Sequence, residues 1–161
     1  MSKPVRVPFE TTLLVRDTCL CLHVQRAARA LARRFDDALR PLGLTNGQFS
    51  LMMALNRPAP PPMGPVAKLL AMDRTTLTAA LKPLERRGLV LITPDPADRR
   101  GRLLALTPAG TALLAQAVPI WTETHADVEA ELPGADPDRL RRDLGALAAT
   151  GQPSHRHRAT V

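Results

Sequence analysis

Apolar and polar positions follow a helical period through the first half of the chain. From Asp17 to Arg40, apolar residues recur at steps of three and four, which predicts one long amphipathic helix with Asp17 as its N-cap. Pro41 ends this helix, because a proline in a helix interior removes a hydrogen bond and clashes with the preceding turn. Residues 1–16 are expected to form a flexible end.

Three shorter helices are predicted next, and each has a recognisable start or stop signal. Thr45 and Gln48 have the spacing of a capping box and open the first helix. A proline-rich linker leads to the second helix, which has Pro65 at its first position. Asp73 caps the third helix, and Gly88 ends it.

After these helices the pattern changes to two short apolar runs. Residues 89–93 and 102–107 lie on either side of a charged turn, residues 94–101, which predicts a strand, a turn and a second strand. Thr107 and Pro108 are typical of an N-cap and a first helical position, so a further helix begins there.

Two helices are predicted for the rest of the chain, spanning residues 108–149, with a bend expected at Pro119 and a new start at Pro137. Residues 150–161 are expected to form a second flexible end. The predicted fold class is mostly α with a small two-stranded β wing, and residues 45–107 have the element order of a winged helix-turn-helix.

Composition narrows the class of protein. With 161 residues, 45% of them hydrophobic, the chain fits a single domain over residues 1–161 with its own core. It has one Trp, three Phe and no Tyr, so the core must consist of Leu, Ala, Val and Met. No apolar run is long enough for a membrane span or a signal peptide, and two nearby cysteines make no disulfide framework. We expect a cytoplasmic protein without a membrane partner.

The net charge of +7 is unevenly distributed along the chain. Residues 1–56 carry 8 basic and 4 acidic groups, residues 57–110 carry 9 and 4, and residues 111–161 carry 5 and 7. The positive excess therefore lies in the first two thirds. This distribution favours a polyanionic partner, most simply nucleic acid, although a merely solubilising surface has the same charge.

The predicted third short helix carries the residue types of a helix that reads DNA. In a helix-turn-helix the second helix enters the major groove, where Arg and Thr side chains contact base edges and Lys contacts phosphate. A solvated helix face with incidental charges is the alternative. The candidate DNA contacts on this helix are Arg74, Thr75, Thr76, Thr78 and Lys82.

The hairpin adds further candidate DNA contacts, and their position at its tip is stronger evidence than their residue type. Arg99, Arg100 and Arg102 lie at or beside its tip, where a guanidinium can enter a narrow, negative minor groove. Asp98 is a further candidate, because its carboxylate can pair with an arginine and hold it in place.

These segments resemble the MarR family of bacterial transcriptional regulators. Residues 69–78 and 84–90 resemble the family's recognition helix and the segment after it, and residues 98–110 resemble its wing. The family's D-x-R…L-T-x-x-G wing pattern is matched by Asp98, Arg100, Leu106, Thr107 and Gly110. Pro83 inside the recognition helix departs from the pattern and should bend that helix after the turns that contact DNA.

The resemblance implies a homodimer that binds a pseudo-palindromic operator in double-stranded DNA, as a repressor. Helices over residues 17–40 and 108–149 would form the dimer, with half-sites one helical turn apart. It also implies a small-molecule effector bound between the dimerising helices and the winged module. The candidate pocket residues are His23, Arg26, Met52 and Trp121, although Trp121 also suits a core or interface anchor.

Cys21 suggests an alternative, a thiol-based redox-sensing regulator. Its segment resembles that of the family's peroxide sensors, and Arg16 and the helix N-terminus would favour the thiolate, but the tyrosines that orient the cysteine in those sensors are missing. A buried inert thiol is the other interpretation. We expect no enzyme, because no oxyanion device, glycine-rich loop or carboxylate pair is present, and no cofactor or metal, because Cys19, His23 and His125 are too few ligands.

Overall fold

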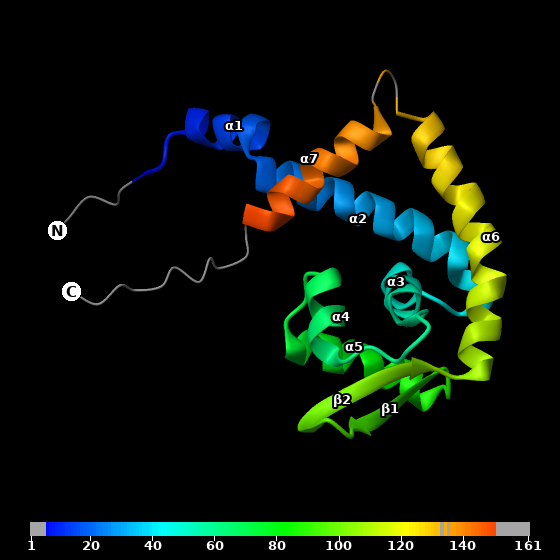
Figure 1. Cartoon of the computed structure of the whole chain (residues 1–161). Coiled ribbons are helices and arrows are strands. Elements are labelled where there is room, and N and C mark those ends of the chain that lie inside the picture. Colours follow the sequence, from blue (N-terminus) through cyan, green and yellow to red (C-terminus); the bar gives the residue numbers. More distant parts are fainter. Residues whose placement is uncertain (1–5, 133, 135, 151–161) are drawn as a thin grey trace, which may run out of the picture.

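The computed structural model describes residues 6–132, 134 and 136–150, and the expected flexible end after residue 150 lies outside these residues. The helices and the hairpin form two groups at opposite ends of the molecule, and a long helix connects them (Figure 1). One end holds the N-terminal and C-terminal helices, and the other holds three short helices and the hairpin. No helix in these ranges is both long and apolar enough to cross a bilayer.

The N-terminal stretch forms two helices, α1 (Phe9–Thr18) and α2 (Leu20–Leu39). Residues 9–16 of the expected flexible end are thus helical. The prediction of Asp17 as N-cap is wrong, because Asp17 lies inside α1 and its carboxylate accepts two hydrogen bonds from Arg16. Cys19 is the N-cap of α2, with an extended backbone and an Sγ that lies 3.5 Å from the amide nitrogen of Leu22.

The first turn and helix of the winged half confirm the predicted boundary signals. After the short 3-10 helix η1 (Arg40–Leu42), Gly43 adopts a left-handed conformation with φ of +64°, and α3 (Asn46–Leu55) begins. Thr45 and Gln48 make both bonds of the capping box, since Thr45 Oγ1 accepts from the Gln48 amide and Gln48 Oε1 accepts from the Thr45 amide.

The next two helices complete the helix-turn-helix. Helix α4 (Met63–Leu69) starts two residues before the predicted Pro65, with Pro62 as its extended N-cap residue. Helix α5 (Arg74–Arg86) begins after Asp73 as predicted and continues through Pro83. Gly88 ends it with φ of +68°, and the Leu89 amide closes back on the Leu84 carbonyl at 3.0 Å.

The wing is longer and tighter than predicted. Strands β1 (Val90–Asp95) and β2 (Asp98–Leu106) are antiparallel, and only two residues separate them, so the prediction of a turn over 94–101 is wrong. The pairing of the strands continues past a shift in register between Pro94 and Asp95, so that Asp95 lies opposite Asp98. The proline-rich linker also joins this hairpin, since the Leu104 amide donates to the Pro61 carbonyl at 3.0 Å.

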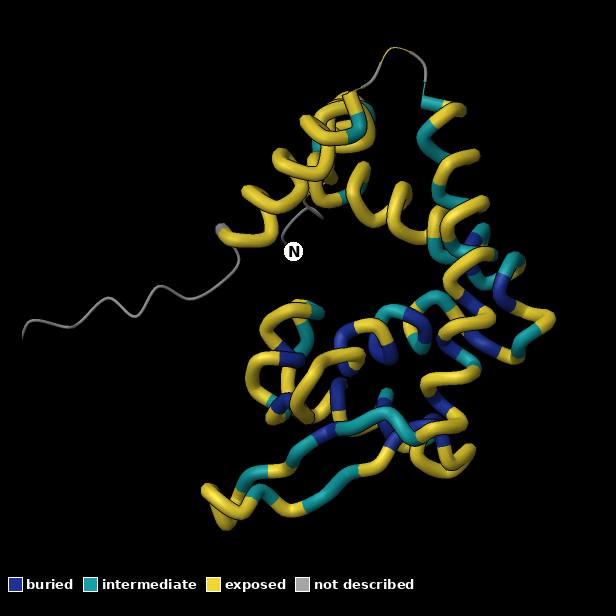
Figure 2. Tube along the Cα trace, turned by 45° about the vertical axis from the view of Figure 1, so that its right-hand side comes forward, coloured by how far each residue is buried: buried dark blue, intermediate teal, exposed yellow. Residues whose placement is uncertain are grey.

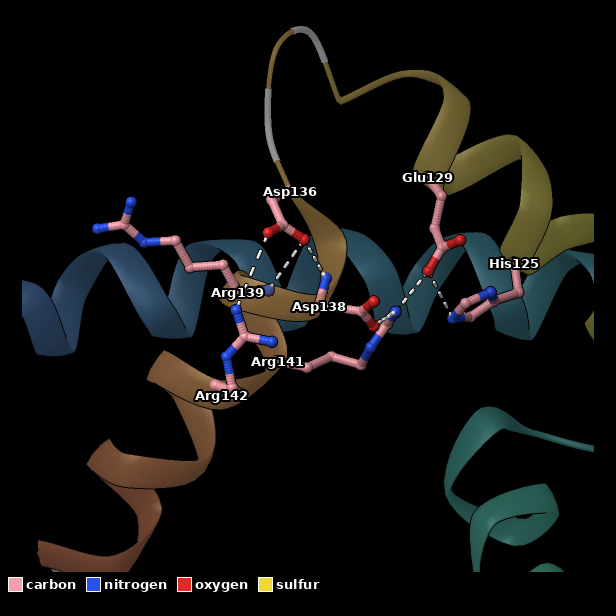
Figure 3. Close-up of polar contacts among 7 residues, drawn as sticks. All are labelled: His125, Glu129, Asp136, Asp138, Arg139, Arg141 and Arg142. Carbon is pink, nitrogen blue, oxygen red and sulfur yellow. Dashed lines mark hydrogen bonds and ion pairs between the residues drawn. The ribbon is translucent and has the colours of Figure 1, made fainter.

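Two more helices follow, α6 (Pro108–Ala130) and α7 (Pro137–Thr150), close to the predicted ranges. Figure 3 shows the polar contacts where they meet. Glu129 of α6 accepts a hydrogen bond from Arg141 of α7 and lies 3.7 Å from His125 Nε2. Asp136 accepts from the Asp138 amide at 2.9 Å, which begins α7. These contacts tie α7 to the end of α6.

The core lies in the winged half and at the base of α6 (Figure 2). Because aromatic residues are few, aliphatic side chains from α2, α3, α5 and the wing supply most of it. The largest fully buried side chains are Leu39, Leu51, Met52, Val66, Leu77, Leu81, Leu84 and Leu104. By contrast, α1 buries no residue, and α7 is exposed at every residue from Asp138 to Ala149.

Gly110 gives a direct test of this packing. A Cβ at Gly110 would lie 2.0 Å from the Leu89 carbonyl oxygen, so Gly110→Ala must push α6 away from the start of β1. We expect a loss of about 1–3 kcal/mol in the free energy of unfolding, measured with urea. Gly145→Ala in α7 is the control, because a Cβ at Gly145 would meet nothing within 4 Å, and it should be neutral or stabilising. Equal stability of the two variants would contradict the close approach.

Candidate nucleic-acid interface

The first turn of α5 is fixed by its cap. Asp73 Oδ1 accepts from the Thr76 amide at 2.7 Å, and Oδ2 accepts from the Thr76 hydroxyl at 2.8 Å. The hydrogen bond from the Thr76 amide contributes most and that from the hydroxyl contributes next. Both stabilise the carboxylate and lower the pKa of Asp73 below its ordinary value. The Thr76 hydroxyl is therefore engaged in the cap, which distinguishes it from the other candidate contacts on this helix.

The remaining candidates of α5 share one exposed face. Leu77, Leu81 and Leu84 point into the core. On the opposite face, a shallow hollow of about 300 Å³ is lined by Arg74, Thr75, Thr78, Ala79 and Lys82. The Thr78 hydroxyl donates to the Arg74 carbonyl at 2.8 Å, so its methyl group and its oxygen lone pairs remain available to contact a partner outside the helix. The sequence-predicted residues of α5, apart from Thr76, thus gather at one place.

The wing, β1 and β2, lies at the same end of the molecule as α5 (Figure 1), and its second strand carries the predicted arginines. Arg99, Arg100 and Arg102 are all exposed. Arg102 donates to the Gly101 carbonyl at 2.8 Å, whereas the side chains of Arg99 and Arg100 make no hydrogen bond or ion pair with the described residues. Two guanidinium groups are therefore available to an external anion.

Asp98 acts differently from the prediction. Its carboxylate accepts from the backbone amide of Arg100 at 2.9 Å and pairs with no arginine side chain among the described residues, so the predicted side-chain pair is wrong. An aspartate bonds a backbone amide two residues on because that geometry is a local turn. Asp98 thus fixes the backbone that carries Arg100.

Two residues at the tip were not predicted. Asp95 accepts from the Ala97 amide at 2.8 Å, which closes the turn. A Cβ on Gly101 would lie 2.9 Å from the Cβ of Asp95, so only glycine fits there. The sequence signal for Gly101 is its position directly after two arginines, because an isolated glycine within a strand often marks a bulge or a close approach of another segment to the backbone.

Two hydrogen bonds place this interface relative to α2. Asp36 of α2 accepts from the Asn46 amide at 2.7 Å, which satisfies a free N–H at the start of α3. Arg87, at the end of α5, donates to the Gly43 carbonyl at 2.7 Å. The start of α3 is thus joined to α2, and the end of α5 is joined to the segment that links η1 to α3.

The predicted effector residues are not brought together. Met52 is fully buried in the core, and His23 and Arg26 are exposed on α2. Trp121 lines an open pocket of about 400 Å³ between α3, α4 and α6. Met53, the next residue along α3, faces that pocket, because consecutive helical residues point in different directions. The full lining is Phe49, Ser50, Met53, Ala54, Leu69, Leu70, Val118 and Trp121.

The cysteines lie at the start of α2. Cys21 is exposed, and the Gln25 side-chain amide donates to its Sγ at 3.1 Å. Arg16 is paired with Asp17. His23 bonds the Cys19 carbonyl oxygen at 2.9 Å through Nδ1. Within the described ranges, no three His, Cys, Asp or Glu side chains converge as metal ligands would.

Comparison with known proteins gives one family throughout. The MarR family profile matches residues 44–101. The transcriptional repressor NicR of Pseudomonas putida is 37% identical over 76 residues, 47% of this chain and 48% of NicR. The transcriptional activatory protein BadR of Rhodopseudomonas palustris is 33% identical over 94 residues, 56% of this chain and 54% of BadR. The matches thus span about half the length of these two relatives.

A solved structure extends the similarity over most of the chain. The Mycobacterium tuberculosis transcriptional regulator MosR, crystallised in complex with DNA, is 40% identical and has a TM-score of 0.75. The match covers 82% of this chain and 95% of MosR. The likeness therefore includes the helices outside the winged half.

The cap of α5 predicts a pH dependence of stability. Because folding lowers the pKa of Asp73, its stabilising contribution is complete above about pH 4, where the unfolded carboxyl titrates, and is lost as the pH falls through the lower folded pKa. Asp73→Asn keeps a capping oxygen without the charge. We expect wild type to lose more stability than Asp73→Asn in urea unfolding between about pH 5 and about pH 2. Parallel losses in the two proteins would show that the carboxylate does not contribute.

Proposed function

This chain belongs to the MarR family of transcriptional regulators, and we propose that it is a sequence-specific DNA-binding repressor. It binds a pseudo-palindromic operator as a homodimer, and a small-molecule effector modulates its affinity for DNA. The observation that carries the proposal is the shared face of α5, where Arg74, Thr75, Thr78 and Lys82 line one exposed hollow beside the wing. A protein with this role works in the cytoplasm, and we assign it no catalytic activity.

The face of α5 suits the major groove. Arg74 and Thr75 stand in the first turn, and in a helix-turn-helix that turn meets the base edges. Arg74 can bond a guanine through two N–H groups, whereas Lys82, two turns later, suits a phosphate. The Asp73 cap supports this assignment, because it fixes the backbone from which Arg74 and Thr75 project.

The wing suits the adjacent minor groove. The side chains of Arg99 and Arg100 have no hydrogen-bonding partner among the described residues, and both residues stand at the tip of a ribbon narrow enough to follow the groove. The minor groove concentrates negative potential where it is narrow, so arginine is favoured there. Asp98 and Gly101 contribute by setting the backbone conformation at the tip.

The dimer is proposed from apolar surface at the opposite end. Phe9, Leu14 and Val15 of α1 are between 50% and 67% exposed, and Leu140 and Leu144 of α7 are each 42% exposed. A helix of this length is marginal without tertiary contacts, so α1 needs a partner surface. A second copy of the chain covers both helices and sets two α5 helices about 34 Å apart, one turn of DNA.

Different observations support the proposal of repression and the proposal of an effector. NicR is named as a repressor, whereas BadR is named as an activatory protein, so we propose repression from the relative with the higher identity. The effector is assigned to the pocket that contains Trp121, because that pocket joins α6 to α3 and α4 of the winged half. His23 and Arg26 remain candidates only if the second copy brings them to that pocket.

A second candidate function is a thiol-based redox response at Cys21. The observation in its favour is that Cys21 is exposed in the first turn of α2, with a hydrogen-bond donor from Gln25 at its sulfur. A helix N-terminus stabilises a thiolate, which is the form that peroxide oxidises. Oxidation there would add a polar group beside the proposed dimer surface.

Fluorescence anisotropy with an operator duplex tests the DNA assignment. Arg100→Ala should weaken binding to most sequences and lower the slope of log affinity against log salt by about one, because one phosphate-like contact is lost. Arg74→Ala should change sequence preference, at a cost of about 1–3 kcal/mol for the matched base. Saturation should require two chains per duplex.

Arg139→Ala is the matched control, since Arg139 is exposed on α7 at the other end of the molecule. It removes the same charge and, where sedimentation shows that the variant still forms the dimer, should leave operator affinity within experimental error. Unchanged binding after Arg100→Ala, or an equal loss in the control, would contradict the wing assignment.

The redox candidate has its own measurement. Hydrogen peroxide should lower the operator affinity of the wild type, a thiol reductant should restore it, and Cys21→Ser should not respond. The rate at which Cys21 reacts with a thiol label should also rise with pH as the thiolate forms. An equal response of wild type and Cys21→Ser to peroxide would remove this candidate.

A further inference from the structure

The carboxyl end of α5 is attached to two different elements of the molecule. The Thr107 hydroxyl, at the start of α6, donates to the Gly88 carbonyl at 2.6 Å. The Arg87 guanidinium donates through Nη1 to the Gly43 carbonyl at 2.7 Å, across 44 positions of sequence. Gly43 follows α2 and η1 and precedes α3. One bond therefore connects the end of α5 to α6, and the other connects it to the turn that follows α2.

The turn that accepts the bond from Arg87 is itself firmly held. Gly43 is in the left-handed region with φ of +64°, and its amide donates to the Arg40 carbonyl at 2.9 Å. The Leu44 amide donates to the Leu39 carbonyl at 3.3 Å, and the side chains of Leu39 and Leu44 are both buried. A turn with two backbone bonds and two buried side chains opens rarely. The Gly43 carbonyl is therefore a fixed acceptor.

The side chain of Arg87 is committed to this turn. A Cβ on Gly43 would lie 3.5 Å from Nη2 of Arg87, so both terminal nitrogens of the guanidinium lie close to Gly43. A hydrogen bond from a charged donor is stronger than one between neutral groups. Arg86, the preceding residue, is also exposed, but its side chain makes no hydrogen bond or ion pair with the described residues. The two neighbouring arginines thus differ in contact and not in charge.

Arg87 lies at one end of α5, and the candidate base contacts lie at the other. The 13 residues of α5 span about 20 Å, with Arg74 and Thr75 in the first turn. A tilt of about 10° about the carboxyl end would therefore move the first turn by about 3.5 Å, close to the rise of one base pair, about 3.4 Å. A helix end attached to one element can tilt about that attachment, whereas attachment to two elements resists the tilt.

We propose that Arg87 is a positioning residue that fixes the tilt of α5, and thereby the separation of operator half-sites that the dimer accepts. In a dimer, the orientation of each α5 relative to α2 and α6 sets the distance between the two helices that enter the major groove. The inference rests on the proposed function, because it concerns how the dimer selects its operator. Arg87 was not among the sequence-predicted DNA contacts, and this role requires no contact with DNA.

Operators of different spacing test the inference. The probes are a duplex that the wild-type protein selects from a random-sequence library, and two versions with one base pair inserted or removed between the half-sites. One base pair moves a half-site by about 3.4 Å and turns it by about 35°. By fluorescence anisotropy, the wild type should bind the selected duplex at least about tenfold more tightly than either altered duplex. Arg87→Met should lower this ratio at least about threefold.

Arg86→Met is the matched control, because it removes the same charge from the adjacent position and breaks no hydrogen bond with the described residues. It should keep the wild-type ratio. Loss of a phosphate contact weakens binding to all three duplexes by the same factor, so the ratio separates positioning from direct contact with DNA. An unchanged ratio in Arg87→Met, or an equal fall of the ratio in Arg86→Met, would overturn the inference.

Urea unfolding examines the same bond without DNA. Loss of a charged hydrogen bond should lower the midpoint of unfolding in Arg87→Met, whereas Arg86→Met should keep the wild-type midpoint. Because Arg87 is exposed, its replacement opens no cavity in the core, and the variant should still unfold cooperatively. Equal midpoints in the three proteins would show that the bond to Gly43 contributes nothing in solution, and the inference would be wrong.

The wild-type measurements separate this inference from the proposed function. If the wild type selects no duplex, the proposed function fails and the inference fails with it. If the wild type binds the selected duplex without any preference for spacing, the proposed dimer on DNA is wrong, and so is the inference. If the wild type prefers one spacing and Arg87→Met has the same preference, only the role of Arg87 is wrong, and the DNA-binding role stands.

Discussion

The junction between the end of α5 and the start of α6 is the constraint on which the winged half depends. The Thr107 hydroxyl donates to the Gly88 carbonyl at 2.6 Å and accepts from the Gly110 amide at 3.0 Å. The Thr107 amide donates to the Leu89 carbonyl at 3.0 Å. One threonine thus caps α6 and fastens it to the end of α5, and the absence of a side chain at Gly110 permits the contact. The wing, α5 and α6 are therefore fixed relative to one another.

This junction explains how the molecule can have two ends with different chemistry. At one end, exposed arginine, threonine and lysine side chains lie on a face whose other side is buried aliphatic core. At the other end, apolar side chains of α1 and α7 are exposed and acidic groups of α6 and α7 pair with arginines. Helix α6 joins the two ends, so the dimer that we propose at one end would set the spacing of the proposed DNA contacts at the other.

Local hydrogen bonds account for the parts that the sequence predicted well. The capping box of Thr45 and Gln48, the Asp73 cap and the Thr107 cap each join residues three positions apart, so the sequence alone predicts them. The left-handed stop at Gly88 is of the same kind. The wrong prediction of the N-cap of α2 also has a local cause. Asp17 was predicted as a cap because of its residue type, but its carboxylate is already engaged by Arg16, and Cys19 has the extended backbone that a cap needs.

The element order, the winged fold class and the division of α5 into a buried and an exposed face follow from the sequence alone, because helical period and capping signals depend on neighbours along the chain. By contrast, side-chain packing sets three features: Asp98 accepts from a backbone amide, Met53 and not Met52 lines the pocket, and the lining residues of the pocket are uncharged. Those features depend on the direction of each side chain and on contacts between distant segments such as α3, α4 and α6. No spacing along a single sequence specifies them, because they arise only when the helices pack.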